Sequence, residues 1–411
     1  MTATALDPGF SNPYRPGAGH MPPYLAGREA EYAEFDQMLK QQTILNNLIL
    51  TGLRGVGKTV LLDTFKPRAI AQGWLWVGTD LSESASVSEA NMATRLITDL
   101  AVATAGVSIE VPAEKPLGFG GVAPSATNRI PLSFDVLMTI FNDEPGLVSD
   151  KLRAVLLFAH EVLSREGKGR VIFAYDEAQN LSDNASQNQF PLSTILDLFQ
   201  SIQKRGVAFL LILTGLPTLF PKLVEARTYT ERMFRVLMLT RLSREDSREA
   251  ILKPIDVADC PIRFYDEAVE VIVTESGGYP YFIQFICREI FDIWLQQLAN
   301  QEDPTVPLDA IQRKLDSDFF AGRWDKATDR QRELLYVISN LEHADDEFTI
   351  QEIVAKGKEL LASPFSSSHA NQMLVTLAAR GLIYKNRFGK YSFAVPMLGG
   401  FILRTYAPTE P

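Results

Sequence analysis

Cysteine and histidine are scarce in this chain of 411 residues, which contains two cysteines and four histidines. No histidine is spaced from another histidine or from a cysteine as zinc ligands are, which argues against a structural zinc site and against a Cys/His nucleophile. The low cysteine content and the lack of a secretory apolar segment predict a reducing, cytoplasmic environment.

Long apolar stretches are also missing. The longest one, Val207–Leu213, is far too short to cross a bilayer, so we expect no membrane association. Hydrophobic residues make up 46% of the chain, charged residues 22% and aromatic residues 10%, which is typical of a globular protein. A chain of this length is expected to form two or three domains.

An overall excess of positive charge is absent, since the formal net charge is −10. Residues 321–411 contain 11 Lys and Arg against 10 Asp and Glu, so they carry +1, whereas the first 320 residues carry −11. A whole-molecule electrostatic interaction with nucleic acid is therefore not expected, and any such contact belongs to the C-terminal part.

Apolar runs separated by helical patterns are present, and they predict a parallel sheet covered on both faces. The predicted strands are Leu48–Thr51, Trp74–Val77, Val171–Tyr175, Ala208–Leu213 and Val236–Leu239. Between the second and third strands, residues 107–131 are rich in Gly, Pro and Ala and show no periodicity. This segment is either a mobile loop or an appendage that binds a partner.

The first predicted strand leads into Gly52-Leu53-Arg54-Gly55-Val56-Gly57-Lys58-Thr59, which fits the pattern G-x-x-x-x-G-K-[ST] of a phosphate-binding loop. Glycines let successive backbone N–H groups curl around phosphates, Lys58 neutralises the β- and γ-phosphates, and the Thr59 hydroxyl binds Mg²⁺. A helix follows and adds its N-terminal partial charge. We expect ATP or ADP to contact Gly52, Arg54, Gly55, Val56, Gly57, Lys58, Thr59 and Val60.

The strand Val171–Tyr175 ends in two acids, Asp176 and Glu177. Acids after a strand are often helix caps, but beside a phosphate-binding loop they suit ATP hydrolysis. Asp176 fits a ligand of Mg²⁺, and Glu177 fits the residue that activates water.

These motifs, together with Gly27-Arg28-Glu29 before the first strand, resemble AAA+ ATPases of the origin-recognition-like and STAND (signal-transduction NTPase) branches. The resemblance implies that Thr214, in a sensor-1 strand, contacts the γ-phosphate or the attacking water. It implies that Arg232 is an arginine finger that reaches a neighbouring subunit's nucleotide, with Arg227 and Arg235 as substitutes. Tyr24 and Arg28 would lie along the adenine, and Pro280 in Gly278-Tyr279-Pro280 would pack against the nucleotide.

One departure from the origin-recognition pattern affects the expected rate. The region Gly277–Gln284 contains Tyr279, Pro280 and Tyr281 where the pattern has a sensor-2 arginine, and Arg288 lies a helical stretch later. This departure favours slow turnover or a switch controlled by bound nucleotide.

The C-terminal part shows three helical patterns followed by two strands joined by a basic turn, which is the order of a winged helix. Such a domain either binds duplex DNA or serves as an interaction module. For DNA contact the candidates are polar residues at the start of the third helix and basic residues of the turn: Ser368, Asn371, Arg380, Lys385, Arg387 and Lys390.

We therefore predict an α/β fold, a P-loop αβα sandwich with a parallel sheet, followed by an all-α lid and a winged-helix domain. The predicted segments are an extended N-terminal segment (1–24), an ATPase core (25–242), the lid (243–302), a linker helix (303–325) and the winged helix (326–411). The predicted activity is Mg²⁺-dependent ATP hydrolysis that drives self-assembly and action on DNA or a partner complex. The alternative is a STAND-like switch that hydrolyses ATP slowly and regulates a protein partner without DNA.

Overall fold

The computed structural model describes residues 11–17, 19–112, 127–258, 263–303, 305–386 and 389–406. The chain divides into two compact units, each made of segments that are not contiguous in sequence. The α/β unit comprises Glu31–Thr51 and Leu61–Leu237. The helical unit comprises Met1–Ala30, Gly52–Val60 and Met238–Pro411.

The α/β unit is built on a five-stranded sheet with the strand order β2-β5-β6-β1-β7. Register pairs such as Leu50↔Thr214 and Phe173↔Leu211 show that neighbouring strands are parallel. All residues of β1, β5 and β6 are buried, as expected for strands covered on both faces. The predicted parallel sheet is confirmed. Its strands are β1 (Asn47–Gly52), β2 (Leu75–Val77), β5 (Val171–Tyr175), β6 (Phe209–Gly215) and β7 (Phe234–Leu239).

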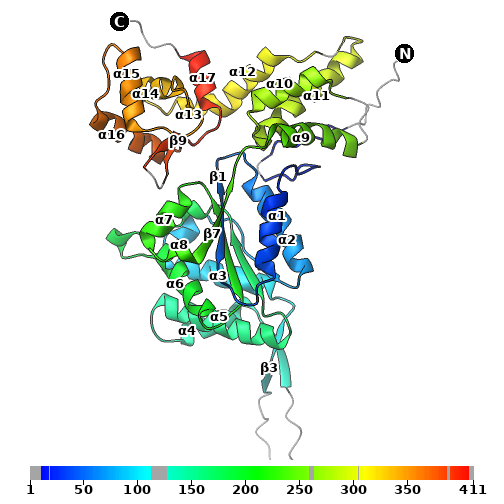
Figure 1. The fold of residues 1–411 in the computed structure, drawn as a ribbon. Helices are drawn as coiled ribbons and strands as arrows, with labels where there is room; N and C mark the ends of the chain where they lie inside the picture. Colours follow the sequence, from blue (N-terminus) through cyan, green and yellow to red (C-terminus); the bar gives the residue numbers. More distant parts are fainter. Residues whose placement is uncertain are drawn as a thin grey trace, which may run out of the picture. The chain divides into compact units, whose positions relative to one another are not determined.

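Helices lie on both sides of this sheet (Figure 1). Phe35 and Phe65 stack with their ring centroids 4.0 Å apart and join the first two helices, whereas Phe173 of the sheet packs edge-on against Phe199 of α6 at 5.2 Å. The helices are α1 (Glu29–Leu39), α2 (Lys58–Ala71), α3 (Glu89–Ala103), α4 (Phe134–Asp143), α5 (Val148–Arg165), α6 (Pro191–Gln203), α7 (Leu219–Ala226) and α8 (Thr230–Met233).

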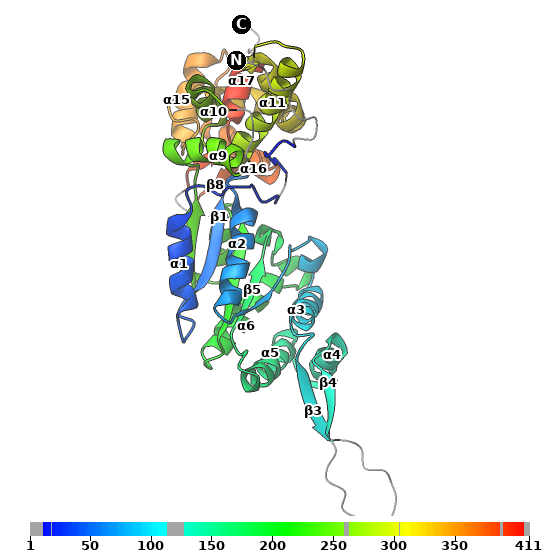
Figure 2. The ribbon, with the colours of Figure 1, turned by 90° about the vertical axis from the view of Figure 1, so that its right-hand side faces the viewer.

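The segment without a clear pattern contains a β-hairpin, which the sequence prediction missed. Strands β3 (Ser108–Pro112) and β4 (Thr127–Pro131) pair antiparallel with Ile109 opposite Ile130. Both views show this hairpin extending away from α4 and α5 (Figures 1 and 2). Strands of five residues beside Gly-, Pro- and Ala-rich sequence are too short to show a distinct hydrophobic period. Residues 113–126 lie outside the described part of the chain.

The helical unit has one continuous hydrophobic core that extends from its first helices to its last. Trp294 is a buried anchor of this core, since its ring lies 5.0 Å from that of Phe264 and its Nε1 donates to the Thr305 carbonyl at 2.7 Å. The helices in this part are α9 (Arg244–Val257), α10 (Asp266–Ser276), α11 (Pro280–Ala299), α12 (Leu308–Leu315), a π-helical segment (Asp316–Ala321) and α13 (Gly322–Trp324).

The C-terminal part contains three helices and a two-stranded antiparallel hairpin in the predicted order. An additional helix, α17 (Leu398–Thr405), was not predicted. It contains Gly399 and Gly400, which disfavour an isolated helix, but Leu398, Phe401 and Ile402 are buried and stabilise it by packing. The other elements are α14 (Asp329–Ser339), α15 (Ile350–Leu360), α16 (Ser367–Ala379), β8 (Ile383–Lys385) and β9 (Tyr391–Phe393). No helix in the described ranges is both long and apolar enough to span a membrane.

Candidate functional site

The carboxyl ends of three parallel strands define the site within the α/β unit. Strand β6 lies between β1 and β5, with Leu50 paired to Thr214 and Tyr175 paired to Leu213. Asp176 and Glu177 directly follow β5, and Thr214 is the second-last residue of β6. Because parallel strands end at the same edge, the predicted acidic pair and Thr214 belong to one edge of the sheet, and β1 leads into the phosphate-binding loop from that edge.

Thr214 is fully buried, at 0% exposure, and its hydroxyl has no hydrogen-bond partner among the described residues. The same holds for Thr51 on the neighbouring strand β1, which is 1% exposed. A buried hydroxyl without a partner costs about 1–3 kcal/mol. Such a group is therefore expected where a ligand or an ordered water supplies the partner.

The phosphate-binding loop has the backbone that its glycines allow. Gly55 and Gly57 have φ values of 81° and 91°, which residues with a side chain rarely adopt. The Lys58 Nζ donates to the carbonyls of Gly52 at 3.0 Å and Leu53 at 2.9 Å, so this side chain folds back over the loop.

Other parts of the helical unit brace this loop. Arg28 is 5% exposed, and its Nη2 donates to the Val56 carbonyl at 3.0 Å and to the Thr240 carbonyl at 3.1 Å. The Tyr281 backbone N–H, next to Pro280 at the start of α11, donates to the Gly55 carbonyl at 3.1 Å. Pro280 is therefore adjacent to a residue that contacts the loop, and the Arg28 guanidinium is hydrogen-bonded to the loop backbone.

The predicted adenine contact of Tyr24 and Arg28 stays a prediction. The Tyr24 hydroxyl donates to Glu249 Oε2 at 2.7 Å. This hydrogen bond, followed by burial, raises the pKa of Tyr24 above its ordinary value.

Asp176 is 5% exposed, and its Oδ1 accepts a hydrogen bond of 2.7 Å from the Glu177 backbone N–H. Asp63 lies on α2, one turn after Thr59. Burial raises the pKa of Asp63, and the negative charges of Asp176 and Asp80 raise it further. The carboxylates of Asp63, Asp80 and Asp176 therefore influence one another electrostatically.

The carboxylates alone do not form a complete metal site. No group of three or more His, Cys, Asp or Glu side chains that could hold a metal occurs among the residues that the structure describes. Mg²⁺ is commonly bound through one or two protein oxygens together with water and substrate phosphates. The predicted roles of Thr59 and Asp176 as ligands of Mg²⁺ stay predictions.

Glu177 adopts a left-handed backbone conformation with φ 53° and ψ 32°. For a residue with a side chain this conformation costs about 1–2 kcal/mol, and such residues concentrate at functional sites. Its Oε2 accepts a hydrogen bond from Gln179 Nε2. Sequence analysis missed Gln179, although its position two residues after the acidic pair was available as a signal.

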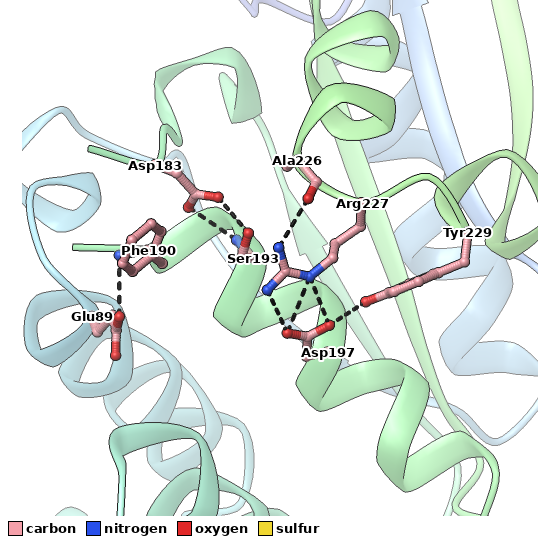
Figure 3. A network of polar contacts seen from close by, with 8 residues as sticks. All are labelled: Glu89, Asp183, Phe190, Ser193, Asp197, Ala226, Arg227 and Tyr229. Carbon is pink, nitrogen blue, oxygen red and sulfur yellow. Dashed lines mark hydrogen bonds and ion pairs between the residues drawn. The ribbon is translucent and has the colours of Figure 1, made fainter. Parts of the chain in front are cut away.

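A polar network surrounds Arg227 (Figure 3). Its guanidinium donates to both carboxylate oxygens of Asp197, with Nη2 at 2.9 Å from Oδ2, and to the Ala226 carbonyl. The Tyr229 hydroxyl donates to the same carboxylate. Burial acts to raise the pKa of Asp197, but the hydrogen bonds from Arg227 and Tyr229 outweigh it and lower this pKa.

The three arginines considered as arginine fingers are therefore not equivalent. Arg227 is held by Asp197, and Arg235 forms an ion pair with Glu34. Arg232 is exposed, and within the described part of the chain its guanidinium forms no ion pair. The predicted role of Arg232 as an arginine finger stays a prediction.

The C-terminal residues predicted to contact nucleic acid mostly interact within their own unit. Arg380 donates to the Lys326 carbonyl and to Gln331 Oε1, and Lys390 pairs with Glu347 at 3.6 Å. Asn371 Oδ1 accepts a hydrogen bond of 3.0 Å from the Tyr391 hydroxyl. Lys385 Nζ lies 5.5 Å from the centroid of the Tyr391 ring. Ser368 is exposed on α16, and Arg387 lies outside the described residues.

Comparisons with known proteins identify the fold. A family model, a domain of unknown function (DUF8462), matches residues 317–402, and no curated protein matches the chain. The solved structure of the Walker-type ATPase Paby2304 of Pyrococcus abyssi is 16% identical with a TM-score of 0.56, over 92% of this chain and 96% of that one. The Aeropyrum pernix ORC2 protein, solved in ADPNP–ADP complexes, is 13% identical with a TM-score of 0.52, over 95% of this chain and 96% of that one.

These similarities show that the chain has the fold of P-loop ATPases of the AAA+ class, an α/β core with a C-terminal helical region. The predicted resemblance to the origin-recognition type is confirmed for the fold. The STAND assignment and the winged helix stay predictions.

Proposed function

We propose that this protein binds Mg·ATP and hydrolyses it to ADP and phosphate. The observation that carries the proposal is that a G-x-x-x-x-G-K-T loop begins at the sheet edge to which Asp176, Glu177 and Thr214 belong. Parallel α/β sheets bind ligands at this edge.

The binding roles follow from charge and donor chemistry. Lys58 and the loop N–H groups would hold the phosphates. The Thr59 hydroxyl and the Asp176 carboxylate would hold Mg²⁺. When bound, this ion neutralises charge that develops on the phosphates.

The hydrolytic roles fall to two side chains at the ends of neighbouring strands. Glu177 would accept the proton of the attacking water, because its carboxylate directly follows the metal-binding acid. The unpartnered hydroxyl of Thr214 would orient this water or the γ-phosphate.

Self-assembly is the second part of the proposal. Arg232 would stabilise the charge on the nucleotide of an adjacent subunit, as arginine fingers do. Its exposure and lack of an ion pair among the described residues support this role, whereas Arg227 and Arg235 are paired within the chain.

A variant of Glu177 tests the hydrolytic role. Glu177→Gln should bind ATP normally and reduce kcat by about 100-fold or more, the usual effect of losing a general base. Glu231→Gln, an exposed acid in α8, is the matched control and should hydrolyse ATP at the wild-type rate. An unchanged rate for Glu177→Gln would refute the assignment.

Mixing two inactive variants tests the role in assembly. Arg232→Ala and Glu177→Gln should each be inactive, but their mixture should regain activity, because a mixed assembly contains sites with both residues intact. Recovery of activity on mixing, measured against each variant alone at the same total concentration, supports action between subunits. No recovery in a mixture that sedimentation shows to be assembled would refute it.

A slowly hydrolysing switch for a protein partner is the second candidate. It is favoured because the Tyr281 backbone N–H provides the contact of the α11 start with the loop, and because Arg380, Lys390 and Asn371 are bonded within their own unit. Duplex DNA should then leave the ATPase rate unchanged. A severalfold stimulation by DNA would instead support action on DNA.

A further inference from the structure

Gln179 lies in the short turn Ala178–Asn180 that follows the acidic pair, and both ends of its side-chain amide are bonded. Its Nε2 donates to Glu177 Oε2. Its Oε1 accepts from the Leu216 backbone N–H at 3.1 Å. One amide therefore connects the carboxylate after β5 to the backbone that follows β6.

These two contacts determine which way the amide faces. The reversed orientation would place Oε1 against the Glu177 carboxylate and the NH₂ group against the Leu216 N–H, so both contacts would become repulsive. Gln179 therefore presents a donor to Glu177 in a defined direction.

The backbone of Gln179 is fixed as well. The Lys222 Nζ, from α7, donates to the Gln179 carbonyl at 2.7 Å. Burial lowers the pKa of Lys222, and the charge of Asp183 partly opposes this shift. A Cβ atom at Gly215 would lie 2.5 Å from Gln179 Oε1, so only glycine leaves room for the amide at the end of β6.

We infer that Gln179 is the positioning residue of Glu177, which holds its carboxylate in a fixed orientation relative to the strand that carries Thr214. This inference rests on the proposed hydrolytic role of Glu177. The amide occupies Oε2 of the carboxylate, and Oε1 then remains to accept the proton of the attacking water. Gln179 itself neither gains nor loses a proton.

The alternative is that Gln179 only stabilises its turn. A stabilising residue affects folding and nucleotide binding together, and it does so whether or not Glu177 has its carboxylate. A positioning residue changes kcat, leaves the affinity for nucleotide unchanged, and has no effect once the carboxylate is gone.

The experiment uses the full chain with Gln179→Leu, which keeps the size of the side chain and removes both hydrogen bonds. Gln187→Leu, at an exposed position in the next turn, is the matched control. The Kd of a fluorescent ATP analogue with Mg²⁺ and the steady-state kcat are measured for each. For Gln179→Leu, kcat should fall about tenfold, the value of one hydrogen bond, with Kd within twofold of wild type. Gln187→Leu should match wild type in both.

The same change is then made in the Glu177→Gln background and followed by single-turnover hydrolysis of radiolabelled ATP. Gln179→Leu should have no further effect there. An equal fall in both backgrounds, or an unchanged kcat in the wild-type background, would overturn the inference. If Glu177→Gln alone leaves the rate unchanged, the proposed function fails instead.

Gln179→Met provides a second variant if Gln179→Leu does not fold, which a lost nucleotide affinity would reveal. Methionine is unbranched like glutamine but lacks both hydrogen-bonding groups of the amide. The same kcat and Kd are therefore expected as for Gln179→Leu. Wild-type kcat in a folded Gln179→Met protein would overturn the inference.

Discussion

The sheet edge of the α/β unit and the region from α16 to β9 both carry polar residues predicted to contact ligands, but these residues differ in whether they have hydrogen-bond partners. At the edge, Thr214 is buried and its hydroxyl has no partner in the part of the chain that the structure describes, and Glu177 adopts a left-handed backbone. In the C-terminal part, Arg380, Lys390 and Asn371 have partners in their own unit. The arrangement at the edge costs stability, whereas the polar residues from α16 to β9 are bonded within their own unit, which indicates that the edge is the region organised for a ligand.

The largest expected difference between the two regions concerns their lysines. Lys58→Ala removes a charged donor from the phosphate-binding loop, so the Kd for Mg·ATP should rise about 10- to 100-fold. Lys390→Ala removes a lysine of the hairpin that pairs with Glu347, and its Kd should stay within twofold of wild type. Titration with a fluorescent ATP analogue measures both. Comparable losses in the two variants would remove the distinction between the regions.

The buried hydroxyls should differ in the sign of their effect on stability. Thr214→Val replaces an unpartnered hydroxyl with a methyl group of similar size, so the Tm should stay the same or rise while kcat falls about tenfold. Tyr391→Phe removes the hydrogen bond to Asn371 and should cost about 1 kcal/mol without changing kcat. Thermal unfolding and steady-state kinetics test the pair, and a lower Tm for Thr214→Val would contradict the account of the edge.

The smallest expected effect concerns Asp197. Its partners lie within the α/β unit, just as Arg380, Lys390 and Asn371 have partners within the helical unit. Because its pKa is lowered in the folded state, its stabilising contribution is complete above the ordinary carboxyl pKa of about 3.9 and is lost as the pH falls below it. Asp197→Asn should therefore be less stable than wild type at pH 7, by less than about 1 kcal/mol, since the pair is partly exposed.

This difference in stability should shrink at pH 3. Urea unfolding at both pH values measures it, and a difference that stays constant would show that the ionised carboxylate contributes nothing. The ATPase rate at pH 7 should not change, because Asp197 holds Arg227, which has no part in the proposed hydrolysis.

The sequence predicted the five strands and the phosphate-binding loop because their signals are local. An apolar run such as Val171–Tyr175 and the spacing of Gly52, Gly57 and Lys58 are each contained in a short window. The hydrogen-bond partners of polar side chains could not be predicted in this way. Arg227 and Asp197 are 30 residues apart, and Gln179 and Leu216 are 37 apart, so only the folded chain brings these pairs together.

Packing also overrode local preference in the elements that the sequence did not predict. Helix α17 forms despite Gly399 and Gly400 because its apolar side chains are buried. The hydrogen bond from Arg28 to the Val56 carbonyl is a contact that no sequence pattern indicates, and the predicted contact of Arg28 with the adenine stays a prediction.

Each unit is built from separate segments of the chain, and this limits how a gene fragment could encode one unit alone. The backbone passes between the two units four times, at residues 30–31, 51–52, 60–61 and 237–238. A gene fragment that ends after residue 237 would encode the whole sheet unit, but its phosphate-binding loop would lack Thr240 and Tyr281, which the complete chain bonds to Arg28 and Gly55. A single recombination boundary at residues 237–238 therefore transfers the α/β unit whole but splits the helical unit, and no single boundary transfers the helical unit intact.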